Sequence, residues 1–343
     1  MATTFKTLNS ANDVTSTRTL LHEAIPLTGT IASGTYTDEN IKTYSHGMFE
    51  SVYDYPYLSS SANHIFDITT GYASNSTLSG SASVQNSKKL NIYSQMAQVL
   101  VGYDATGSIQ SFDQDGDIAG GGTKIKEALF VNFSRLLSKD EIKKGSFEMA
   151  VYTAGAMPAL TTTLTIADHG AATSYKVNSP AGEYGILYTS SSGITADSGV
   201  GLIYYQAGVA VLTGSVFAAS LMGPGVTVAT GYSAIATGST IDVMANCFRN
   251  RIHNISFNNT VELNSTVYFC RASHNEFNYS ANPTYLSESQ IRVKNSTTDN
   301  PVSYVTTVGL YSSDNELLAV AKLSEPLKKD PSTEVTLRVR LDF

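Results

Sequence analysis

The last nine residues of the chain alternate strictly between apolar and polar side chains. The apolar positions are Val335, Leu337, Val339, Leu341 and Phe343, and Thr, Arg or Asp stands between them. A period of two is typical of a strand with one buried face, so this segment is predicted to be a strand. Apolar runs on either side of turn-forming residues also predict two hairpins, over residues 201–213 and 301–323.

Two segments carry the signals of a helix. Over residues 87–101 apolar side chains recur at the spacing i, i+3, i+4, with Asn86 or Ser87 as the candidate N-cap and Gly102 at the C-terminal end. Over residues 139–144 a capping-box sequence is followed by two lysines and a glycine. We therefore predict two short helices, with strands around 128–152 on either side of the second.

Residues 1–85 show little periodicity and are interrupted by glycine and proline, yet they are rich in aromatic side chains. We expect this segment to be an extended N-terminal arm that buries its aromatic rings against the body or against a neighbouring subunit. The candidate partner contacts are Tyr53, Tyr55, Tyr57 and Phe66, since tyrosine in particular is favoured where one end of a ring is dry and the other wet.

Residues 151–240 hold only four charged side chains, at Asp168, Lys176, Glu183 and Asp197. An uncharged β surface aggregates when it is exposed, so this zone must be covered either by its own sheets or by partner chains, and we slightly favour partners. We expect it to elaborate a body built from residues 86–150 and 241–343. The predicted fold class is mainly β, with a β-sandwich-like body.

Composition narrows the function classes. The 343 residues carry a formal net charge of −7, which argues against a general nucleic-acid binder, whose affinity rests on basic charge. The sequence contains no apolar run of 18 residues and no apolar segment at its N-terminus, so we expect no membrane association and no secretory signal. The two cysteines, Cys247 and Cys270, lack metal-ligand spacing and are expected to be buried thiols.

One polar cluster could carry chemistry. Asp113, Asp115 and Asp117 alternate around Gly116, and three carboxylates at such spacing can wrap a hard cation such as Ca²⁺. The cluster departs from the EF-hand pattern, because Lys124 stands where that pattern has a glutamate, and a solvated acidic turn is the favoured interpretation. The sequence contains no phosphate loop, nucleophile elbow or zinc-protease motif, so we expect no cofactor and no enzymatic activity.

Several stretches are similar to those of a known group of proteins: residues 44–57 (YSHGMFESVYDYPY), 95–102 (QMAQVLVG), 135–147 (RLLSKDEIKKGSF), 275–285 (NEFNYSANPTY) and 308–343. They resemble virion structural proteins of contractile-tailed bacteriophages, from the tail, baseplate or neck, especially those of marine cyanophages. The resemblance covers most of the chain and implies a structural subunit of the virion, which we expect in the tail or baseplate assembly. It further implies contacts with other phage structural proteins and self-association in a symmetric assembly.

Two alternatives remain open. A receptor-binding or fibre-attachment protein at the particle surface would also suit a weakly charged, Gly/Ser/Thr-rich β zone, although the long repeats of fibre shafts are absent from the sequence. A tail-associated enzyme that degrades cell wall or polysaccharide would need two carboxylates that converge in a cleft. With 29 acidic residues spread along the chain, the sequence singles out no such pair.

Overall fold

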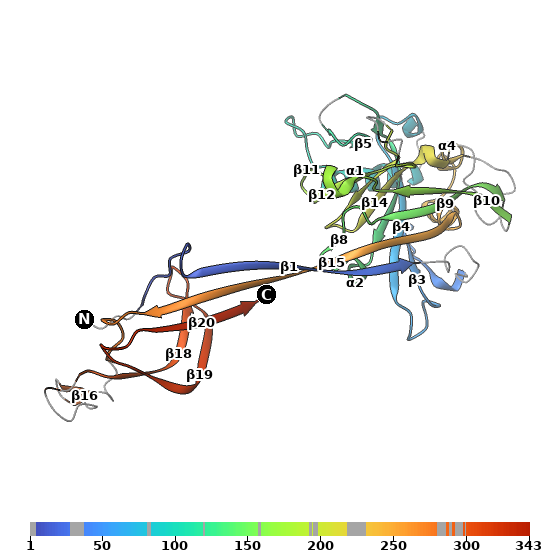
Figure 1. Cartoon of the computed structure of the whole chain (residues 1–343). Helices are drawn as coiled ribbons and strands as arrows, with labels where there is room; N and C mark the ends of the chain where they lie inside the picture. The colour runs from blue at the N-terminus through green and yellow to red at the C-terminus, as the bar shows by residue number, and fades with distance from the viewer. Residues whose placement is uncertain are drawn as a thin grey trace. The chain divides into compact units, whose positions relative to one another are not determined.

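The computed structural model describes residues 5–27, 38–80, 84–118, 121–156, 159–191, 194, 198–217, 231–279, 286–287, 290–291, 298 and 300–343. The chain is mainly β, as predicted, with 47% of its residues in strands and 18% in helices. It divides into two compact units (Figure 1). Unit 1 comprises Met1–Leu20 and Glu262–Phe343, and unit 2 comprises Leu21–Val261.

The central sheet of unit 2 has eight strands, and each neighbouring pair runs antiparallel. In spatial order these are β11 (Lys176–Ser179), β12 (Gly182–Leu187), β13 (Gly201–Tyr204), β14 (Val209–Thr213), β7 (Glu127–Phe133), β4 (His64–Tyr72), β3 (Glu50–Tyr53) and β2 (Ile41–Thr43). The hairpin predicted over 201–213 is confirmed as β13 and β14.

A second sheet contains six strands, and β15 pairs with four of the other five. They are β1 (Val14–Leu27), β15 (Ile252–Ala272), β9 (Glu148–Ala156) and β10 (Ala159–Ala167), with β8 (Glu141–Ile142) and β20 (Val335–Asp342) also paired to β15. Strands β1 and β15 each run from one unit into the other, so two strands connect the units.

The core of unit 2 lies between its two sheets, which makes it a β-sandwich. Met149 of β9 and Phe257 of β15 belong to the same buried cluster as Leu129, Val131 and Phe133 of β7. The intervening side chains of β7 point to the opposite face of the sheet, where they enter a second cluster beneath a helix. Because β7 is buried on both faces, its sequence is an almost continuous apolar run.

That helix is α1 (Val84–Leu100), which confirms the helix predicted over 87–101. It begins before the predicted N-cap residues, so Asn86 and Ser87 lie inside it. Its C-terminal end is as predicted: Gly102 has a φ of +89° and its N–H bonds to Ala97 O at 2.9 Å.

The helix predicted over 139–144 is wrong. Only α2 (Arg135–Ser138) is helical there, and the segment that follows forms β8. Ile142 of β8 is fully buried, and its N–H donates to Tyr205 O at 3.0 Å. Pairing with β15 and burial of this side chain outweigh the local capping signal.

The second helix of more than seven residues is α5 (Ile241–Arg249), which was not predicted. It starts at Thr240, whose side chain accepts a hydrogen bond from Val243 N at 3.3 Å, and it buries Met244 and Phe248 in the core. The remaining short elements are α3 (Ala171–Ser174), α4 (Tyr232–Ala236), η1 (Asp38–Asn40), η2 (Thr77–Gly80), η3 (Gly214–Phe217), β5 (Phe112–Asp113), β6 (Lys124–Ile125), β16 (Leu286–Ser287) and β17 (Gln290–Ile291).

Unit 1 contains the C-terminal half of β15, residues 262–272, and β20 pairs with it antiparallel. The predicted hairpin over 301–323 is confirmed as β18 (Ser303–Tyr311) and β19 (Leu317–Lys329). The fully buried Lys329 fixes the base of this hairpin, since its Nζ donates to Asn278 Oδ1 at 2.6 Å. The predicted C-terminal strand is confirmed as β20, whose apolar side chains share one face.

The four segments expected from the sequence differ from the two units. Three strands of the central sheet, β2 to β4, come from residues 41–72, and Ile68 of β4 lies in the sandwich core. Residues 1–4, 28–37 and 81–83 lie outside the described residues, so the arm over 1–85 as a whole stays a prediction. In the weakly charged zone, β13 and β14 are buried along their full length by the sheet and α1 of this same chain.

Candidate functional site

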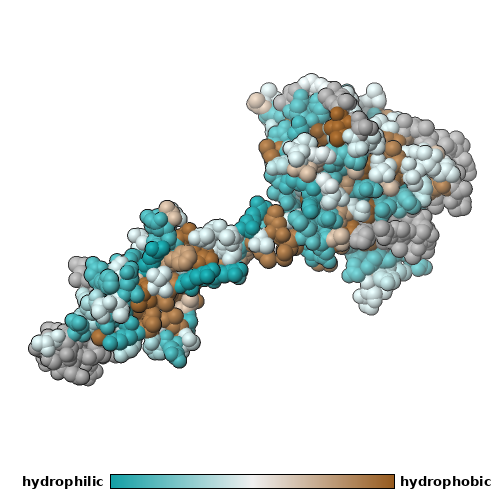
Figure 2. Space-filling model, viewed as in Figure 1, coloured by the Kyte–Doolittle hydropathy of each residue, from teal (hydrophilic) through white to brown (hydrophobic). Residues whose placement is uncertain are grey.

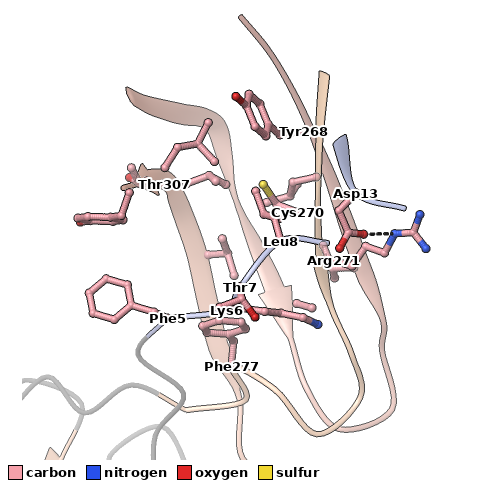
Figure 3. Close-up of a pocket in the computed structure, with 18 of the residues that line it drawn as sticks. Phe5, Lys6, Thr7, Leu8, Asp13, Tyr268, Cys270, Arg271, Phe277 and Thr307 are labelled. Carbon is pink, nitrogen blue, oxygen red and sulfur yellow. Dashed lines mark ion pairs between the residues drawn. The ribbon is translucent and has the colours of Figure 1, made fainter. Parts of the chain in front are cut away.

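A large groove runs through unit 1, between the β15–β20 sheet and the β18–β19 hairpin. Its volume is about 1350 Å³. Aromatic and aliphatic side chains from all these strands line it, among them Tyr268, Tyr304, Tyr311, Leu318 and Leu337, and Phe5 and Phe277 join them from segments outside the strands. Figure 3 shows the N-terminal segment from Phe5 to Leu8 crossing the groove. The Phe5 ring meets the Tyr311 ring edge to face, with the centroids 5.1 Å apart.

The groove exists because the side chains of unit 1 do not fill the space between its strands. Among the described apolar residues of this unit, only Val267 and Val339 are buried, and none belongs to either core cluster. By contrast Tyr304 is 48% exposed and Leu318 is 69% exposed. Hydrophobic side chains gather on the visible face of unit 1, at the lower left of Figure 2.

Two ion pairs at the groove are closed within the unit. Arg271 Nε lies 3.3 Å from Asp13 Oδ1, the ion pair drawn in Figure 3. Lys6 forms an ion pair with Glu276, and its hydrogen bond is the main reason that the pKa of this carboxyl is lowered. The opposite charges of each pair cancel, so these pairs add no net charge to the groove. The rest of its surface is mainly apolar.

The two cysteines differ in burial. Cys247 is fully buried, as predicted, and burial raises the pKa of its thiol to about 11. Cys270 lines the groove and is only half-buried, which corrects the expectation of a second buried thiol. Burial raises its pKa too, with a smaller contribution from Asp13. Both thiols are therefore protonated at neutral pH, and neither is an activated nucleophile.

The structure brings the three predicted metal-ligand candidates together in unit 2. One ligand oxygen from each of Asp113, Asp115 and Asp117 lies within 4.8 Å of the others. However, the ammonium group of Lys124 is hydrogen-bonded to Asp113 and lies 3.8 Å from Asp117 Oδ1. A cation from the chain itself thus already occupies part of the cluster and offsets part of its negative charge. Burial raises the pKa of Asp113, against the lowering effect of Lys124.

We expect millimolar Ca²⁺ to leave the melting temperature of the protein unchanged. The side chain of Asp113 is fully buried and paired with Lys124, so a metal ion would have to displace that ammonium group before it could reach all three carboxylates. Thermal unfolding followed with and without Ca²⁺, with Mg²⁺ as the control, measures this directly. A rise in melting temperature specific to Ca²⁺ would contradict the pairing as described.

The predicted partner contacts fall into two groups. Tyr55 and Tyr57 are 56% and 37% exposed, and the half-buried Tyr53 has its ring 6.4 Å from that of Tyr57. These three tyrosines stay candidates for contact with a partner. Phe66 is fully buried and its ring meets that of Phe133 edge to face. It therefore packs in the core of this chain and is not accessible to a partner, which corrects the prediction.

Sequence reasoning missed the groove, although β19 carried a signal for it. Leu317, Leu318 and Val320 stand almost side by side in the sequence, so apolar side chains point to both faces of this strand. All three are more than half exposed. A strand that is apolar on both faces needs cover on both faces, and within the described residues β19 pairs only with β18.

None of the helices in the described parts of the chain is long and apolar enough to cross a membrane. Comparisons with protein-family models, with curated proteins and with solved structures found no match to this chain.

Proposed function

We propose that this chain is a structural subunit of a bacteriophage particle that acts through permanent contacts with other proteins, and we assign it to the tail or baseplate assembly. The observation that supports the proposal is the uncovered apolar surface of unit 1. Tyr304, Tyr311 and Leu318 all line the groove and are 46–69% exposed.

The energetics of unit 1 support a contact of this kind. Ordering the backbone of one residue costs about 1–2 kcal/mol in conformational entropy, which a folded unit offsets mainly by burying apolar surface. With only Val267 and Val339 buried among its described apolar side chains, unit 1 gains little from its own packing. Contact with another protein surface would supply the missing burial, and soluble monomers rarely leave so large an apolar area uncovered.

The choice of a virion subunit comes from the sequence stretches that resemble phage structural proteins, such as residues 44–57 and 135–147. A particle provides permanent cover for a surface like that of unit 1, whereas a free-standing enzyme would expose it to water. Localisation in the virion, with assembly in the host cytoplasm, is part of the proposal.

The test is made on purified particles of the virus that encodes this chain. We expect the protein among the virion proteins, and we expect an antibody against it to label the tail or baseplate in electron micrographs. Its absence from purified particles would refute the proposal. Label confined to fibre tips, together with binding to host cells, would indicate the receptor-binding alternative. Turnover of a cell-wall polymer by the purified chain would indicate the enzyme.

A further inference from the structure

We propose that the groove of unit 1 is covered by a second copy of this chain, which makes unit 1 the self-association module of the protein. The inference rests on the proposed function, because it names one partner for the surface that supports that function.

The uncovered area is of the size that a stable subunit contact requires. Eleven large apolar or aromatic side chains among the described residues of unit 1 are 38–75% exposed, and five of them line the groove: Phe5, Tyr279, Tyr304, Tyr311 and Leu318. With aromatic side chains of about 150–250 Å² and smaller aliphatic ones, these residues leave on the order of 1,000 Å² of surface in water. A standard interface buries about 800 Å² on each partner, so a contact of that size extends from the groove over neighbouring exposed side chains of unit 1.

The charge of unit 1 permits contact between identical copies. Its sequence holds ten basic and eleven acidic residues, a net charge of −1, whereas unit 2 holds twelve and eighteen, a net charge of −6. Two copies that meet through unit 1 therefore avoid the repulsion that contact through unit 2 would bring. The ion pairs Asp13–Arg271 and Lys6–Glu276 are closed within one chain, which leaves these charged groups no need of a charged partner.

The need for cover arises as soon as the chain folds. Unit 1 has no member of either core cluster among its described residues, so it gains little stability before its groove is covered. A second copy is present wherever the chain is made, and a nearly neutral surface does not repel its own copy. An unrelated partner would have to be supplied in matching amounts at the same time.

The experiment measures the molar mass of the full chain by light scattering over a wide range of concentrations. We expect at least twice the chain mass of 36.6 kDa for the wild type. The variant Leu318→Glu introduces a charge into the groove and should reduce the mass to that of one chain. Leu136→Glu is the matched control, because Leu136 is 66% exposed, almost as much as Leu318, but belongs to α2 of unit 2. It should keep the wild-type mass.

A second measurement needs no variant. Cys270 lines the groove and Cys247 is fully buried, so a thiol reagent added to the native protein reports on the groove. We expect its reaction rate to fall as the protein concentration rises and copies associate. A wild type that stays a single chain at all concentrations would overturn the inference. So would a mass that is unaffected by Leu318→Glu together with a reaction rate independent of concentration. Either result leaves the presence of the chain in virions to be tested separately.

Discussion

Replacing Asp168 with alanine is expected to lower the free energy of unfolding of unit 2 by about 3–5 kcal/mol. Asp168 follows β10, and its buried carboxylate accepts three hydrogen bonds: from Gly145 N at 2.7 Å, from Phe147 N at 3.1 Å and from Tyr205 OH at 3.0 Å. These donors belong to the turn before β9 and to the β13–β14 hairpin, so one side chain links the two sheets. Alanine would leave all three donors without their acceptor.

The control is Asp168→Asn, which keeps one acceptor oxygen in nearly the same volume. We expect it to lose less stability than the alanine variant in urea unfolding at neutral pH, because Gly145 N and Tyr205 OH can share that oxygen. Equal stability of the wild type and the alanine variant would show that these hydrogen bonds do not hold the sheets together.

The same pair of proteins tests a pH dependence. Burial raises the pKa of Asp168 from 3.8 to about 6, so between these values the folded state holds a proton that the unfolded chain has released. This contribution to stability is complete below pH 3.8 and is lost as the pH rises through 6. The stability of the wild type relative to Asp168→Asn should therefore fall by roughly 2–2.5 kcal/mol between pH 4 and pH 7. A difference that is constant or rises with pH would contradict the raised pKa.

A methyl group on Gly71 is expected to cost about 3 kcal/mol of stability. Gly71 lies in β4 where α1 crosses the sheet, and a Cβ there would lie 2.6 Å from Lys89 O and 2.8 Å from Tyr93 N. Both atoms belong to the helix backbone, so the clash cannot be relieved by a side-chain rotation, and α1 would have to move off the second core cluster. Thermal unfolding of Gly71→Ala should show a clearly lower melting temperature than the wild type.

Gly80→Ala provides the comparison, because it makes the same chemical change in the same unit. Gly80 ends η2, and a Cβ there would meet no atom within 4 Å. Its effect should stay within a few tenths of a kcal/mol, or be slightly stabilising, since alanine restricts the unfolded chain. If both alanine variants had the same melting temperature, the close approach of β4 and α1 would not be the cause of the lost stability.

The elements that the sequence predicted correctly depend on local signals. Helix α1 has an apolar stripe and ends at Gly102, and β20 alternates with a period of two. The segment 139–144 shows where local signals fail. Its capping sequence favours a helix, but Ile142 is buried only when the segment pairs with β15, about 120 positions away. No periodicity in the segment itself encodes that partner.

The candidate site was less predictable for a related reason. The acidic cluster could be found from its spacing, but the ammonium group that pairs with Asp113 comes from Lys124, on the far side of a loop. The groove depends on how far two pairs of strands stand apart, which the alternation in β20 cannot reveal. That alternation identified Leu337 and Leu341 as one face correctly, yet both side chains are only half-buried, because the space in front of them is unfilled.

Unit 1 draws on both ends of the sequence, and this imposes an order on its formation. Phe269 N donates to Asp13 O at 2.8 Å across 256 positions of the chain. Synthesis proceeds from the N-terminus, so Leu21–Val261 is complete, and its sandwich can fold, before residues 262–272 of β15 are made. Until then, the unit 1 part of β1 lacks its partner strand. The groove comes into being only after β20 has been made. A nascent chain therefore carries no finished groove, so the contact that we propose forms only between completed chains.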